Sequence, residues 1–143
     1  HNRCRRQRQM CIRDRVCAAD IFLGVGFLGG RLDHQLAAFS ALLKEPRPVV
    51  LIDEDQLVFV VPAQFQMELD AHSPLGFYPM LPVQVTLRGV KWPLDDVEMR
   101  PTGQIATSNM SNGELLHVQV DGPGLLAIMP ACHLPRVLDA LRN

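Results

Sequence analysis

A glycine-rich stretch, placed between an apolar run and a helical pattern, constrains the fold of this chain most strongly. Residues Gly24–Gly30 read GVGFLGG and follow the apolar run Ala18–Leu23, which is typical of a buried strand. A helix with one buried face is predicted next, from the spacing of Leu32, Leu36, Phe39 and Leu43. Glycines allow a tight turn and the first helical N–H groups are unpaired, so the arrangement is typical of an anion site.

The polar residues at the predicted helix start suit phosphate chemistry. Arg31 has a planar cation that matches phosphate oxygens, and Asp33 has a carboxylate that could position a hydroxyl or contact a metal. The alternative is an ordinary surface ion pair beside a tight turn. The spacing of the glycines excludes both the dinucleotide fingerprint and the P-loop.

The rest of the chain predicts a fold of class α/β plus all-β. Pro46 and Pro48 end the helix, and Val49–Ile52 form a second buried strand, so residues 17–54 are expected to be a truncated, parallel α/β domain. Short runs with turn residues between them predict an antiparallel β-sandwich over residues 55–143. Its expected strands are 56–61, 64–69, 76–81, 84–87, 97–100, 114–120 and 124–129, followed by a helix over 131–142.

Residues 1–16 differ from the rest in charge and pattern. Six of the 14 basic residues and one of the 15 acidic residues lie there, which leaves a net charge of −6 on the remainder. An acidic body argues against nucleic-acid binding. The segment has no apolar periodicity, and residues 9–15 resemble translated sequencing-adapter sequence, so we expect residues 1–16 to be non-native. No apolar run is long enough to span a membrane, which favours a cytoplasmic protein without membrane partners.

Two segments of the predicted sandwich carry side chains that suit a heterocyclic ligand. Trp92, the single tryptophan, precedes Pro93 and offers a flat face for a cationic or aromatic group. The alternative is a tryptophan buried in the core. Thr107–Asn109 supply hydroxyl and amide groups that can donate and accept, although a polar turn is an equal interpretation.

Taken together, these segments resemble one enzyme family. The sequences GGRLDH at Gly29–His34, GVKWPL at Gly89–Leu94 and TSN at Thr107–Asn109 resemble thiamine pyrophosphokinase in order and separation. The resemblance extends from about Asp20 to Met129. Val90 stands where leucine is more usual.

The resemblance implies an ATP-binding α/β domain, a thiamine-binding β-sandwich and a homodimer whose pockets join two chains. The reaction would transfer pyrophosphate from ATP to the thiamine hydroxyl, with Mg²⁺ as cofactor and AMP as leaving group. The acidic metal motif of the family has no counterpart here, so no metal ligand is predicted. Arg31 and Asp33 would be catalytic, and Gly29, Gly30, Arg31 and His34 would bind the nucleotide. The thiamine-binding residues would be Trp92, Ser108 and Asn109.

Two rival functions remain open at this point. The chain could be a catalytically inactive, truncated fragment of that enzyme. It could also be a β-sandwich module that binds another heterocycle through Trp92.

Overall fold

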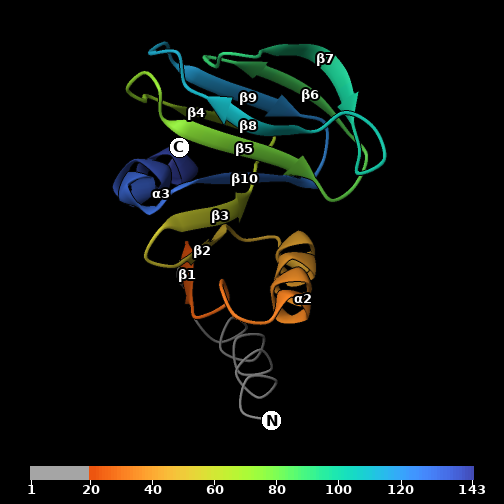
Figure 1. Ribbon diagram of the computed structural model, residues 1–143, viewed down its shortest axis with the longest axis vertical. Coiled ribbons are helices and arrows are strands. Elements are labelled where there is room, and N and C mark those ends of the chain that lie inside the picture. The colour runs from red at the N-terminus through yellow and green to blue at the C-terminus, as the bar shows by residue number, and fades with distance from the viewer. Residues whose placement is uncertain (1–19) are drawn as a thin grey trace.

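The computed structural model describes residues 20–143, which form a mostly β structure with two α-helices (Figure 1). The predicted non-native segment 1–16 lies outside the described residues. The strands are β1 (Phe22–Val25), β2 (Val49–Ile52), β3 (Gln56–Val60), β4 (Gln64–Met67), β5 (Pro74–Pro79), β6 (Val83–Arg88), β7 (Leu94–Met99), β8 (Ala106–Met110), β9 (Leu116–Val120) and β10 (Leu125–Pro130). The helices are α2 (Leu32–Lys44), the 3₁₀ turn η1 (Ala131–His133) and α3 (Leu134–Arg142).

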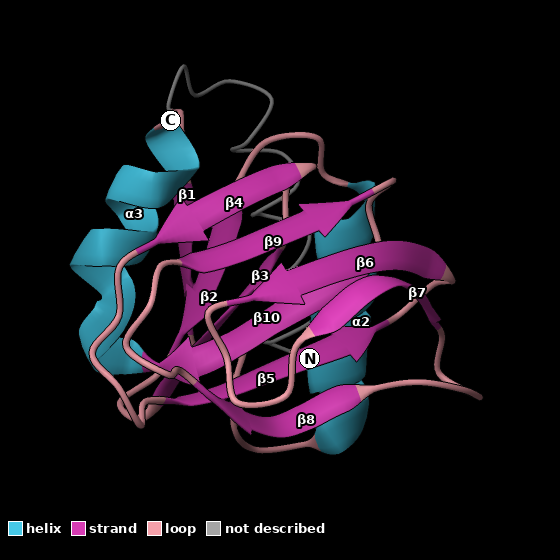
Figure 2. Cartoon of the chain, turned by 90° about the horizontal axis from the view of Figure 1, so that it is seen from above, coloured by secondary structure: helices cyan, strands magenta, loops and turns pink. Residues whose placement is uncertain are grey.

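The strands form two sheets that face each other. The larger sheet has the order β1-β2-β3-β10-β5-β8, and the smaller has the order β4-β9-β6-β7 (Figure 2). β1 and β2 pair in parallel, with Phe22 opposite Val49, as expected for strands joined through a helix. β2 pairs with β3 in antiparallel orientation. The parallel unit and the antiparallel sandwich therefore share one continuous sheet across the predicted boundary between residues 54 and 55.

Two apolar clusters hold these layers together. The larger lies between the sheets and includes Phe59, Phe65 and Phe77, with Val137 of α3 closing one end. The smaller lies between α2 and the first strands and includes Leu42, Leu51 and Val58. Alternating side chains explain the arrangement, because successive strand residues point to opposite faces of a sheet. On β3, Leu57 and Phe59 belong to the larger cluster, and Val58 between them belongs to the smaller cluster.

The predicted face of α2 agrees with the structure at Phe39, which packs against the smaller cluster, and is wrong in the first half of the helix. Leu32 and Leu36 are 69% and 49% exposed, whereas Ala38 and Leu42 are buried. Ala38 and Leu42 pack in one cluster with Leu51 and Val58 of the sheet. The first strand is also an edge rather than a buried strand, because Val25 is 74% exposed at the end of the sheet.

The predicted positions of the sandwich strands agree with the structure within a few residues, with one strand missed. The polar segment at 106–110 forms β8, which pairs with β5 across an irregular register. Asn112 and Gly113 then connect two different sheets, because β8 and β9 belong to different sheets. No helix among residues 20–143 is long and apolar enough to cross a membrane.

Candidate functional site

The glycine loop before α2 presents an exposed ion pair. Gly29 and Gly30 have φ of 72° and 85°, a left-handed backbone that glycine adopts without strain. Arg31 precedes the helix and donates two hydrogen bonds to Asp33, from Nε to Oδ1 at 3.1 Å and from Nη2 to Oδ2 at 2.7 Å. The backbone N–H of His34 also donates to Asp33 Oδ1 at 3.1 Å. Both predicted catalytic residues thus lie side by side in the first turn.

The charge of Asp33 is stabilised by these donors. The hydrogen bonds from Arg31, followed by the positive charge of that residue, hold the pKa of the Asp33 carboxyl below its ordinary value. Desolvation opposes the shift only in part. The carboxylate therefore stays ionised at neutral pH and is available as a hydrogen-bond acceptor.

The described residues do not fit a magnesium site. Residues 20–143 contain no group of three or more His, Cys, Asp or Glu side chains that could hold a metal ion. Both carboxylate oxygens of Asp33, the acid of the glycine loop, accept hydrogen bonds from Arg31. The expected cofactor therefore finds no ligand set here, and no step proposed below passes through a metal.

Trp92 lies on the surface, in the connection between β6 and β7. Trp92 is 53% exposed, so the alternative interpretation of a tryptophan buried in the core is wrong. The residue lines a hollow of about 380 Å³ together with Leu94 of β7, residues 104–107, Ser108 and Asn109. The structure thus brings the three predicted thiamine-binding residues to one place.

Asn109 holds the backbone of Trp92 rather than facing outward. Its Oδ1 accepts from the Trp92 N–H at 3.2 Å and from the Met110 N–H at 2.9 Å, and its Nδ2 donates to the Trp92 carbonyl at 3.0 Å. The residue is 3% exposed. An amide has two acceptor sites and two donors, so one N–H remains for another partner. Direct contact of Asn109 with a ligand stays a prediction, whereas its contact with Trp92 is a structural fact.

The segment before Trp92 is fixed to the end of β8. The Lys91 N–H donates to the Met110 carbonyl at 2.9 Å, and the Asn112 N–H donates to the Gly89 carbonyl at 3.1 Å. Gly89 has φ of 80°, and a Cβ atom there would collide with the Leu115 carbonyl. The backbone at Gly89 therefore passes close to Leu115, and this close approach helps to set the backbone path that leads to Trp92.

Ser108 lies beside the indole in an unusual backbone conformation. Its φ is 59°, the left-handed region that non-glycine residues adopt rarely and that is common at functional sites. The residue is exposed and lines the hollow beside Trp92 as well as a second hollow of about 410 Å³ next to Gly76 and Ile128. Its hydroxyl is thus available at the surface shared by both hollows.

Lys91 was not singled out from the sequence, yet it contacts the predicted aromatic platform. Its Nζ lies 4.7 Å from the centroid of the Trp92 ring, within the range of a cation–π contact. The signal was present in the sequence, since a lysine next to an exposed tryptophan can reach its ring. Whether Lys91 contacts the Trp92 ring depends on the backbone path between Gly89 and β7, which the sequence alone does not specify.

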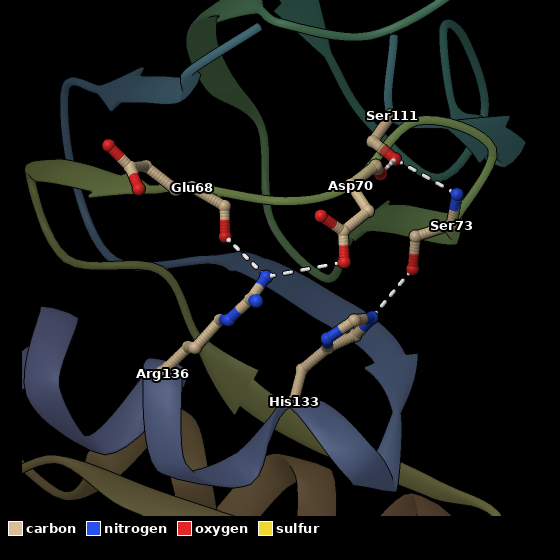
Figure 3. A network of polar contacts seen from close by, with 6 residues as sticks. All are labelled: Glu68, Asp70, Ser73, Ser111, His133 and Arg136. Carbon is tan, nitrogen blue, oxygen red and sulfur yellow. Dashed lines mark hydrogen bonds and ion pairs between the residues drawn. The ribbon is translucent and has the colours of Figure 1, made fainter. Parts of the chain in front are cut away.

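A polar network supports the other end of the β8 segment (Figure 3). Ser111 is 1% exposed; its Oγ donates to the Asp70 carbonyl and accepts from the Ser73 N–H at 2.9 Å. Ser73 Oγ lies 2.6 Å from His133 Nε2 at the start of α3. Ser111 also forms a bridge with Val90. The network therefore links the C-terminal helix to the segment that carries Trp92.

The second polar link in Figure 3 joins α3 to the end of β4. Arg136 Nη1 donates to the Glu68 carbonyl at 3.2 Å and lies 3.9 Å from an Asp70 carboxylate oxygen. Burial, and then the positive charge of Arg136, lower the pKa of His133, while the Asp70 charge opposes the shift. His133 is therefore neutral near pH 7.

The two groups of predicted residues lie far apart within one chain. Gly29–His34 lie in the loop between β1 and α2 and in the first turn of α2, and this loop is in the lower part of the described chain in Figure 1. The connection between β6 and β7, which holds Trp92, lies in the upper part with the smaller sheet. The structure thus joins Trp92, Ser108 and Asn109 into one cluster and leaves Arg31, Asp33 and His34 as another.

Comparison with known sequences points to one family. Residues 64–125 match the family model described as thiamin pyrophosphokinase, vitamin B1 binding domain. That range contains the Trp92 cluster. Thiamine pyrophosphokinase 2 of Arabidopsis thaliana is 34% identical over 114 residues, which is 74% of this chain and 43% of the relative. Thiamine pyrophosphokinase 1 of the same plant is 32% identical over the same shares. The chain thus spans less than half the length of these relatives.

Solved structures show the same fold. Thiamine pyrophosphokinase from Bacillus subtilis superposes with a TM-score of 0.71 at 22% identity, over 85% of this chain and 60% of that one. A protein from Lactobacillus plantarum superposes with a TM-score of 0.67 at 28% identity, over 83% of this chain and 61% of that one. Sequence relatives, family model and fold agree, and the resemblance of this chain to the thiamine pyrophosphokinases is confirmed.

Proposed function

We propose that this chain contributes the thiamine-binding part of a thiamine pyrophosphokinase, which transfers pyrophosphate from ATP to thiamine and releases AMP. The observation that carries the proposal is the exposed Trp92 ring, fixed by Asn109 beside the Ser108 hydroxyl and a hollow. The match of residues 64–125 to the vitamin B1 binding domain supports it.

Thiamine chemistry fits the cluster. The thiazolium carries a permanent positive charge, which an indole face attracts, and the aminopyrimidine offers ring nitrogens and an amine. The Ser108 hydroxyl can donate to or accept from that edge, and the remaining N–H of Asn109 can donate. The ring is half exposed and its backbone is held by Asn109, so less backbone ordering is needed when a ligand stacks on it.

The glycine loop suits the nucleotide. A Cβ atom added at Gly29 would meet nothing within 4 Å, so phosphate oxygens have room there, and Arg31 can neutralise their charge. Asp33, ionised because of Arg31, can orient the attacking hydroxyl of thiamine, and His34 can contact the nucleotide. In this proposal residues 17–54 belong to an α/β nucleotide domain.

The separation of the two clusters within one chain supports a homodimer. One thiamine hydroxyl must reach one β-phosphorus, so in-line transfer requires both clusters at the same site. Within one chain they lie at opposite ends of the view in Figure 1. We therefore propose that the thiamine cluster of one chain faces the glycine loop of another, in a cytoplasmic enzyme. The Mg²⁺ that the family resemblance implies would need ligands other than a cluster of side chains within residues 20–143.

Calorimetric titration of the 143-residue chain with thiamine tests the binding part of the proposal. We expect saturable thiamine binding that Trp92→Ala weakens by about 1–2 kcal/mol, the range of a cation–π contact. Gln119→Ala, at an exposed position on β9, is the control and should bind thiamine normally. Absence of thiamine binding, or binding that Trp92→Ala leaves unchanged, would contradict the proposal and favour a module for another heterocycle.

A further inference from the structure

The ammonium of Lys91 covers one face of the Trp92 ring. Its Nζ lies 4.7 Å from the ring centroid, and both residues are exposed to solvent. The ion pairs found among residues 20–143 do not include Lys91. Within the described part of the chain, the Lys91 ammonium therefore has the Trp92 ring as its partner.

The contact rests on a fixed backbone. The Lys91 N–H is bonded to the Met110 carbonyl, and both backbone polar groups of Trp92 are bonded to the Asn109 amide. Lysine has a flexible four-carbon stem, so its ammonium can leave the ring while the indole keeps its place. The fold thus supplies a removable cation beside an aromatic ring whose backbone is held in place.

We propose that Lys91 is a specificity-determining residue, whose ammonium competes with cationic ligands for the Trp92 ring. The inference rests on the proposed function, because it takes thiamine as the ligand. A cation that approaches the covered face must displace Lys91, and a cation on the other face meets a ring already polarised by it. In both cases the Lys91 ammonium repels the positive charge of the ligand.

The competition selects against simple cations. A quaternary ammonium without a heterocycle gains only the ring contact, which it must exchange for the contact of Lys91. Thiamine gains the ring contact and also hydrogen bonds from its aminopyrimidine to the Ser108 region. The competitor lowers the affinity of both cations by the same factor and spares a neutral heterocycle. Tetramethylammonium then has no other contact to retain it, whereas thiamine keeps the hydrogen bonds of its aminopyrimidine.

Fluorescence titration tests this directly, because Trp92 is the single tryptophan of the chain. The ligands are thiamine, tetramethylammonium and the neutral 4-amino-2-methylpyrimidine, each added to the wild type and to Lys91→Met at low salt. An exposed cation–π contact corresponds to a factor of about 2–5 in affinity. We expect Lys91→Met to tighten both cations by at least that factor, with a smaller gain for the neutral ligand and with loss of the effect in high salt.

Two control variants separate the ring contact from the change in net charge. Lys44→Met removes the other lysine of the chain, at the end of α2, and should behave as the wild type. Lys91→Arg keeps a cation at the ring and should not tighten thiamine. Equal gains in Lys44→Met and Lys91→Met would overturn the inference, because they would reflect net charge alone.

A measurement without ligand checks the geometry. Acrylamide is neutral and quenches exposed indoles by contact, so its quenching constant should rise when Lys91→Met uncovers the ring. An unchanged constant overturns the inference. So does thiamine binding that Lys91→Met leaves unchanged or weakens. If wild-type protein binds no thiamine at all, the proposed function itself fails, and that result differs from a failure of the Lys91 variants alone.

Discussion

Replacement of Asn109 by alanine should damage the site by releasing Trp92. The change removes three hydrogen bonds of a side chain that is 3% exposed, two of them to the Trp92 peptide groups and one to the Met110 N–H. Each such bond contributes about 0.5–1.5 kcal/mol net. Water can reach the half-exposed Trp92, so the lower part of the sum applies. We expect the free energy of unfolding to fall by about 1.5–3 kcal/mol.

Loss of the Asn109 contacts should also be visible in Trp92 itself. The indole would gain motion, so the fluorescence anisotropy of the single tryptophan should fall. Thiamine affinity should fall by about tenfold, since the ring must be ordered again on binding. Gln119→Ala, at an exposed position on β9, controls for the loss of an amide side chain and should change none of these values.

A different result would refute this reasoning about Asn109. If Asn109 acts only by reading the pyrimidine, then Asn109→Ala would lower thiamine affinity while the melting temperature and the anisotropy stay unchanged. Asn109→Asp offers a second check, because it keeps Oδ1 but places a charged oxygen against the Trp92 carbonyl. We expect it to be at least as damaging as alanine.

Three further predictions concern single residues. Gly89→Ala should lower stability by about 1–3 kcal/mol in chemical denaturation, because φ is 80° and a Cβ would meet the Leu115 carbonyl; near wild-type stability would contradict this. The folded-state pKa of His133 lies below its ordinary value of 6.5, so the unfolded state binds the proton more readily. Stability should therefore be full above about pH 6.5 and fall as the pH drops below it, and His133→Gln should flatten that dependence in thermal melts. Asp33→Asn should leave the melting temperature unchanged, because the Arg31 pair is exposed, but should lower turnover by on the order of 10²-fold in active enzyme; normal turnover would reduce Asp33 to a structural role.

The sequence predicted the strands because their patterns are local. Phe65 and Met67 alternate with glutamines on β4, and Leu116, Val118 and Val120 alternate on β9, which is sufficient to assign a half-buried strand. β8 was missed because Ala106–Met110 is polar and carries few strand-forming side chains. Its pairing with β5 comes from tertiary contacts, and its irregular register places Asn109 inward.

The helix face and the site contacts depend on information that is not local. Leu32 and Leu36 fit the helical spacing, but both are exposed, and α2 buries Ala38 and Leu42 instead. The residue types of the Trp92 cluster were predicted through the family resemblance. The roles of Asn109 and Lys91 were not, because they depend on how the segment at Gly89 approaches β8.

A crystal structure of the chain grown with saturating thiamine tests the central claim most directly. The account predicts thiamine in van der Waals contact with the Trp92 indole, about 3.5–4 Å between ring atoms, with its pyrimidine edge within hydrogen-bond distance of Ser108. It also predicts that the Asn109 amide keeps both hydrogen bonds to the Trp92 backbone. Thiamine bound elsewhere, or a Trp92 ring without ligand contact at full thiamine occupancy, would contradict the account.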